Sequence, residues 1–157
     1  MISLFIIKKV NRAFSLIELL LVVAIIGILS SITLVSLNQS KIKARDARII
    51  LGIRQLVPFA EFIYNKKNSY ADLCDDGEIR IDYLYQDELT SINMEISNNG
   101  GYVFCYADTN KYCIYSRLNI SGVGFFCIDN TGKAIITDID PGTKECNFTG
   151  NMTCPSN

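Results

Sequence analysis

An apolar segment near the N-terminus places the strongest constraint on how this chain of 157 residues can fold. Residues 16–37 read LIELLLVVAIIGILSSITLVSL, and Glu18 is the only charged side chain among them. A helix of this length extends for about 30 Å, which matches the hydrocarbon core of a bilayer. Residues 14–37 are therefore predicted to form a membrane-spanning helix.

The residues before this segment are interpreted as a leader peptide, residues 1–13. The apolar run at residues 2–7 is too short to span a bilayer, and Lys8, Lys9 and Arg12 place positive charge just before the long segment, as expected on the cytoplasmic side. An ordinary secretory signal fits poorly, because it needs a shorter apolar core followed by a small-x-small cleavage site. Basic residues also follow the span, so charge bias alone does not fix its orientation.

Glu18 indicates a specific role for the apolar segment. A carboxylate inside a membrane helix costs a few kcal/mol and marks a candidate functional residue whose partner should be a cation. The helix itself offers no cation nearby. Cleavage between Ala13 and Phe14 would create an α-amino group only four residues from Glu18, and this amine is a candidate partner.

These residues resemble a known signal. Arg12–Leu20, RAFSLIELL, and Ala24–Leu29, AIIGIL, look like the class III signal of type IV prepilins and type II secretion pseudopilins. The resemblance implies that a prepilin peptidase cuts after Ala13 and methylates Phe14. It also implies that Glu18 faces the N-terminal amine of a neighbouring subunit during assembly. The resemblance covers about residues 8–70 and is strong as far as residue 36.

Two positions depart from the family pattern. Ala13 occupies the place before the cut that is usually glycine, although it is also small. Val35 stands where a proline is often found near the end of the apolar run. The helix therefore lacks that source of a bend.

Residues 38–68 are predicted to continue the helix as an amphipathic stem. Apolar residues recur mainly three and four positions apart, which is the spacing of one helix face: Ile42, Ile49, Ile53, Leu56, Ala60 and Ile63. The solvent-facing side is expected to hold Lys43, Asp46, Arg54, Gln55 and Glu61.

Three features are expected to shape the later part of this stem. Gly52 and Pro58 interrupt the helical pattern, and a kink is predicted before Pro58 because proline removes one backbone hydrogen bond. The helix should stop near Asn68, since Asn65 and Ser69 also favour a helix end. Tyr70 would then cap the base of the following domain.

Residues 69–157 are predicted to form a small head of antiparallel strands. Apolar and polar residues alternate at residues 102–106, 112–116, 124–128 and 134–137, and turn-forming residues separate these runs. The fold class is therefore α+β, with a long N-terminal hydrophobic helix packed against a small antiparallel sheet. Residues 72–100 show no clear pattern; Ile79, Ile81 and Tyr83 fit either a strand or a loop.

Six cysteines lie beyond the apolar segment and indicate an oxidising compartment with disulfides: Cys74, Cys105, Cys113, Cys127, Cys146 and Cys154. No Cys-x-x-Cys pair suggests zinc or redox chemistry. Many pairings are open. A three-residue turn at residues 108–110 would favour Cys105–Cys113, a C-terminal loop would favour Cys146–Cys154, and Cys74–Cys127 would remain.

Charge divides the chain beyond the span into two parts. Lys and Arg outnumber acids in residues 38–67, whereas acids outnumber Lys and Arg from residue 68 onward. A basic stem could meet the acidic head of a neighbouring copy, although solvated surface charge explains the same pattern.

The sequence argues against an enzyme. It contains no histidine, no G-x-S-x-G motif and no P-loop. No cofactor is predicted. Asp138 and Asp140 are calcium candidates, because a related site occurs in some major pseudopilins.

The resemblance implies a structural pilin or pseudopilin subunit of a type IV pilus or a type II secretion-like filament. Its implied partners are other copies and other pilins, the prepilin peptidase, an inner-membrane assembly platform and, before assembly, membrane lipid. The expected location is a single pass through the inner membrane with the head outside the cytoplasm, then a surface or periplasmic filament. The alternatives are a tethered exported domain that binds DNA or a surface without polymerising, and an anchored exported enzyme.

Overall fold

The computed structural model describes residues 14–80, 85–120, 122, 124–149 and 151–156, without the side chains of residues 33–36. The chain forms two compact units, Met1–Gln39 and Ser40–Asn157. A single helix, α1 (Leu16–Lys67), contributes to both units. The expected leader, residues 1–13, lies outside the described residues.

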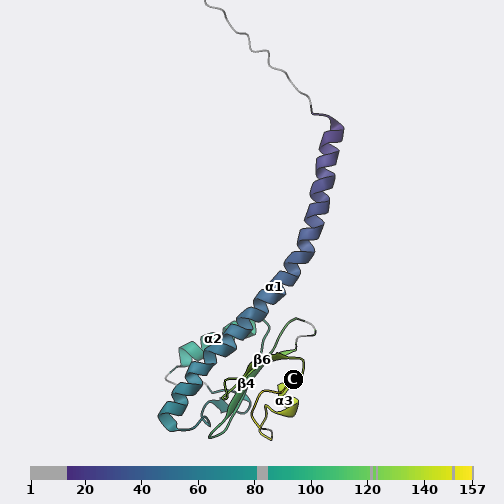
Figure 1. The fold of residues 1–157 in the computed structure, drawn as a ribbon. Coiled ribbons are helices and arrows are strands. Elements are labelled where there is room, and N and C mark those ends of the chain that lie inside the picture. The colour runs from purple at the N-terminus through teal and green to yellow at the C-terminus, as the bar shows by residue number, and fades with distance from the viewer. Residues whose placement is uncertain (1–13, 81–84, 121, 123, 150, 157) are drawn as a thin grey trace, which may run out of the picture. The chain divides into compact units, whose positions relative to one another are not determined.

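The second unit consists of the later part of α1, two further helices, a two-stranded sheet and a four-stranded meander sheet (Figure 1). Its elements in chain order are β1 (Cys74–Asp75), β2 (Glu78–Ile79), α2 (Gln86–Asn98), β3 (Phe104–Ala107), β4 (Tyr112–Arg117), β5 (Phe125–Asp129), β6 (Ala134–Thr137) and α3 (Pro141–Lys144). The four strands β3–β6 pair in sequence order, each antiparallel to the next. The predicted α+β fold class is confirmed.

The core of the head forms where α1 packs on this sheet. Ile49, Ile53 and Leu56 are buried on α1 and belong to one cluster with Ile114 of β4 and Phe126 of β5. Their spacing of three and four residues keeps them on one side of the helix. The apolar stripe predicted for residues 38–68 is therefore the face that holds the sheet.

Asp46 corrects the prediction for the opposite face of the stem. Its side chain is only 4% exposed, because it lies three residues before Ile49 and so falls on the buried stripe. Asp46 Oδ1 accepts hydrogen bonds from the Asn119 backbone N at 2.7 Å and from Asn119 Nδ2 at 2.8 Å. Its Oδ2 accepts from Ile120 N at 3.0 Å. The carboxylate thus fastens the segment after β4 to α1.

Helix α2 occupies the region in which the sequence showed no clear pattern. Leu89 and Ile96 are buried and Ile92 is partly buried, which gives a narrow apolar stripe at helical spacing. Gly52 of α1 allows α2 to approach closely, since a Cβ at Gly52 would lie 2.6 Å from Ile96 Cγ1. Gly52 therefore serves packing. Ile79 lies in β2, and the predictions for Ile81 and Tyr83 fall outside the described residues.

The end of α1 follows the sequence signals. The helix includes Pro58 and ends at Lys67, and Asn68 adopts a left-handed φ of 52° that terminates it. The kink before Pro58 stays a prediction. Beyond this end, Tyr70 is buried and its hydroxyl donates to Glu61 at 3.1 Å. Burial, followed by the hydrogen bond to Glu61, raises the pKa of Tyr70 to about 12.

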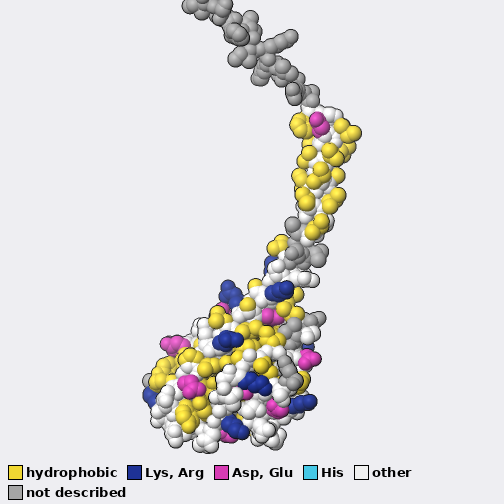
Figure 2. Space-filling view, viewed as in Figure 1, with side chains coloured by type: hydrophobic (Ala, Val, Ile, Leu, Met, Phe, Trp, Pro, Cys, Tyr) yellow, Lys and Arg dark blue, Asp and Glu magenta, His cyan; other side chains and the backbone are white. Residues whose placement is uncertain are grey.

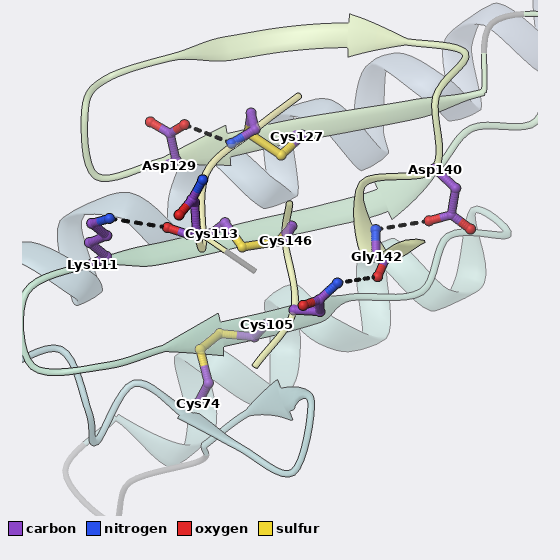
Figure 3. The surroundings of a disulfide bond; sticks show 12 residues. Cys74, Cys105, Lys111, Cys113, Cys127, Asp129, Asp140, Gly142 and Cys146 are labelled. Carbon is purple, nitrogen blue, oxygen red and sulfur yellow. Dashed lines mark hydrogen bonds between the residues drawn. A yellow bond between two sulfur atoms is a disulfide. The ribbon is translucent and has the colours of Figure 1, made fainter. Parts of the chain in front are cut away.

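The disulfides differ from the predicted pairing because of the β3–β4 register. Cys105 pairs across the ladder with Ile114, and Cys113 pairs with Tyr106. Neighbouring positions along a strand face opposite sides of a sheet, so Cys105 points into the α1 core whereas Cys113 lies in a separate cluster on the other face. The observed bonds are Cys74–Cys105, Cys113–Cys146 and Cys127–Cys154 (Figure 3).

The C-terminal segment covers this second face of the sheet. Besides its two disulfides, it is held by Asp129, whose Oδ2 accepts from Cys154 N at 2.8 Å. Lys133 Nζ donates to the carbonyl oxygens of Cys154 at 2.9 Å and Pro155 at 2.8 Å. Both faces of the sheet are thus packed, one by α1 and one by a cross-linked loop.

The disulfide pairing is testable by mass spectrometry without reduction. Trypsin and chymotrypsin together have sites between every two consecutive cysteines of the chain. We expect linked peptides that join Cys74 to Cys105, Cys113 to Cys146 and Cys127 to Cys154. A peptide pair joining Cys105 to Cys113 would contradict the β3–β4 register.

Replacing Asp46 should destabilise the head. Asp46→Ala removes three hydrogen bonds to a charged acceptor and leaves their donors without a partner, so the free energy of unfolding should fall by about 3 kcal/mol. Urea unfolding of the full chain in detergent, followed by near-UV circular dichroism, measures this. The matched control Asp138→Ala removes an exposed acid outside any helix and should cost less than about 0.5 kcal/mol. Equal effects of the two variants would contradict the role of Asp46.

Candidate functional site

The first part of α1 presents its apolar side chains to the surroundings. Leu16 is 75% exposed and Ile28 is 63% exposed, and the other large apolar residues described in this part are similarly open. Figure 2 shows hydrophobic side chains along the visible side of this stretch. Leaving such side chains in water costs roughly 1.5–3 kcal/mol each. Lipid or other apolar helices must therefore cover this surface.

The length of this part fits a membrane. Among the described residues, α1 is the one helix that contains a stretch long and apolar enough to cross a bilayer, judged by length and composition. That stretch begins near the N-terminus. Within residues 16–37, Glu18 remains the only charged side chain.

Glu18 lies in the first turn of α1 and caps its start. Glu18 Oε2 accepts a hydrogen bond from the Ser15 backbone N at 2.9 Å, and the backbone N–H groups of Glu18 and Leu19 both point to the Ser15 carbonyl. Ser-x-x-Glu is the capping-box sequence, in which the glutamate satisfies a backbone donor that the helix leaves free. The negative charge also suits the positive end of the helix dipole.

Sequence reasoning missed this capping role. The signal was present, because Ser15 and Glu18 have capping-box spacing immediately before an apolar run. Glu18 was interpreted only as a charge inside a membrane helix, and its local role in capping that helix was not predicted. Replacing Glu18 therefore changes the start of the helix as well as any contact of its carboxylate with a partner.

The cap leaves part of the carboxylate available. Only Oε2 of Glu18 has a hydrogen-bond partner among the described residues. Phe14, the first described residue, is exposed and lies one position before the capped Ser15. A cation can therefore approach Oε1 while Oε2 keeps the helix start in place. Ala13 lies outside the described residues, so the geometry of the expected cleavage bond is not part of this site.

The head offers little support for the calcium candidates. Asp138 is exposed, and Asp140 caps α3, since its Oδ1 accepts from Gly142 N at 3.0 Å (Figure 3). Within the described part of the chain, no group of three His, Cys, Asp or Glu residues could hold a metal ion. A calcium site at Asp138 and Asp140 stays a prediction.

The candidate residues thus fall into two separate sets. Phe14 and Glu18 are neighbours at the start of α1. The six cysteines all form disulfides within the head, and none of them is free. The disulfides serve the architecture of the head, and the carboxylate oxygen that a cation can approach lies at the helix start.

Comparison with known proteins identifies this helix start. Residues 8–34 match the family described as the prokaryotic N-terminal methylation motif. No curated protein and no solved structure matches the chain. The matched residues include Ala13, Phe14 and Glu18, together with most of the exposed apolar stretch. This chain carries the class III prepilin signal of type IV pilins and pseudopilins.

Proposed function

We propose that the chain is a structural subunit, a pilin or pseudopilin, of a type IV pilus or a type II secretion-like filament. The observation that carries the proposal is the match of residues 8–34 to the methylation motif. An apolar helix that presents its side chains outward and bears one carboxylate in its first turn supports it. The proposal assigns no catalytic residue.

Processing would turn the precursor into the mature subunit. A prepilin peptidase cuts between Ala13 and Phe14 and methylates the new amine of Phe14. The mature chain waits as a single-pass protein of the inner membrane, surrounded by lipid. Its head lies outside the cytoplasm, where the three disulfides are stable. The assembly platform then transfers the subunit into the filament.

Burial of the apolar helix keeps the assembled subunits together, because a subunit that left the filament for water would expose its apolar side chains. Each large apolar side chain that moves from water into a helical core contributes roughly 1.5–3 kcal/mol, although exchange from lipid gains less because lipid tails are also apolar. Glu18 sets the register, which is the alignment of adjacent subunits along the filament. Its open oxygen binds the Phe14 amine of an adjacent subunit, and a buried ion pair of this kind favours one arrangement over the alternatives more than it adds stability.

Two variants separate the assembly role of Glu18 from its capping role. Glu18→Ala removes both the cap and the charge, whereas Glu18→Gln keeps a side-chain acceptor for Ser15 and removes only the charge. We expect both variants to be cleaved normally and both to lose filaments, by roughly tenfold or more in sheared material. Immunoblots of the membrane and sheared fractions measure this.

Glu145→Gln is the matched control, because it removes an acid from the head and should leave filament amounts unchanged. Normal filaments from Glu18→Gln together with loss in Glu18→Ala would show that capping alone explains the need for Glu18. That outcome would contradict the pairing with the amine.

A further inference from the structure

A short part of α1, residues 40–48, which is largely exposed apart from the buried Asp46, is here named the neck. Lys41, Lys43 and Arg45 are exposed there, and none of the three takes part in an ion pair with another described residue. Arg48, at the end of the neck, is bound to Glu95 at 3.0 Å. Lys41 and Arg45 precede Gly52 by eleven and seven residues, so they lie on the α2 side of α1, as Arg48 does. Lys43 is the neck cation that the described head leaves open on the other side.

A groove runs along α2. It has a volume of about 640 Å³ and is lined by Asp87, Thr90, Ser91, Met94 and Glu95, with Arg48 at its edge. Asp87 forms no ion pair among the described residues. Met94 is 59% exposed and offers an adaptable apolar contact. Since Glu95 is paired with Arg48, Asp87 supplies the uncompensated negative charge of the groove, which therefore suits one cationic side chain beside an apolar contact.

The positions of neck and groove around α1 complement each other. Gly52 marks the side of α1 on which α2 packs. Lys43 precedes Gly52 by nine residues, which is about two and a half helical turns and therefore the opposite side of the helix. Ala47, one turn after Lys43, is small and exposed on that same side. Two parallel copies lying side by side meet through opposite sides, so the Lys43 side of one faces α2 of the other.

We propose that the groove along α2 binds the neck of a neighbouring parallel copy, with Lys43 directed at Asp87. This inference rests on the proposed function, since it requires copies packed in parallel. Charge complementarity selects the occupant, because Lys43 and Asp87 have opposite charges and neither forms an ion pair among the described residues. One exposed pair contributes no more than about 1 kcal/mol and is screened by salt. Repetition at every subunit makes the contact effective in setting register.

A photo-crosslinking residue at Ser91, which lines the groove and is exposed, tests the contact in filaments of the full chain. After irradiation of sheared filaments, mass spectrometry should find Ser91 joined to residues 40–48 of a second copy. The control position Thr143, exposed on α3, should give no link to the neck. Filaments whose Ser91 links map to other residues would overturn the groove assignment and leave the proposed function standing. Absence of the chain from sheared material would overturn the proposed function itself.

A charge exchange gives a second test. Lys43→Glu should lower the amount of sheared filament by roughly tenfold, because like charges then face each other at each contact. Adding Asp87→Lys to Lys43→Glu should restore most of it. Lys144→Glu, which reverses an exposed charge on α3, should have no effect. Unchanged filament amounts in Lys43→Glu, or no recovery in the double variant, would overturn the proposed contact.

Discussion

The exposed apolar surface of α1 is the constraint on which the other features of this protein depend. Its side chains, including Leu16 and Ile28, have no cover within the described chain, and water is a poor solvent for them. A bilayer and a bundle of identical helices both remove this surface from water. In the proposed assembly the subunit passes from one to the other, and Glu18, the only charged residue of the segment, is proposed to fix its position in the bundle.

The same helix changes its role after the neck. From Asp46 onward, one stripe of α1 is buried under the sheet, and the opposite face is exposed. Asp46 joins this stripe through three hydrogen bonds to Asn119 and Ile120. The small head is reinforced on both faces of the sheet, by α1 on one and by two disulfides and Asp129 on the other. Such reinforcement compensates for the small core of a domain of this size.

The spacing of apolar residues and the composition were enough to predict the long helix, its buried stripe and the four strands, because each of these features has a local sequence pattern. Contacts between residues far apart in the sequence, such as the disulfides and the packing of α2, were not predictable in the same way. The pairing of Cys105 depended on a one-residue register between β3 and β4, which reverses the face on which each cysteine lies. Helix α2 has a narrow apolar stripe formed by Leu89, Ile92 and Ile96. This stripe packs against α1 at Gly52, a contact that the sequence pattern does not reveal. The cap formed by Ser15 and Glu18 could have been predicted from their spacing but was not.

The most direct test of the account is the N-terminus of the protein in cells, determined by intact mass and N-terminal peptide mapping of membrane and sheared fractions. If the leader is processed as proposed, the chain begins at methylated Phe14 in both fractions. A chain that retains Met1 and stays in the membrane fraction would contradict it. That result would favour a tethered exported domain that binds DNA or a surface without polymerising.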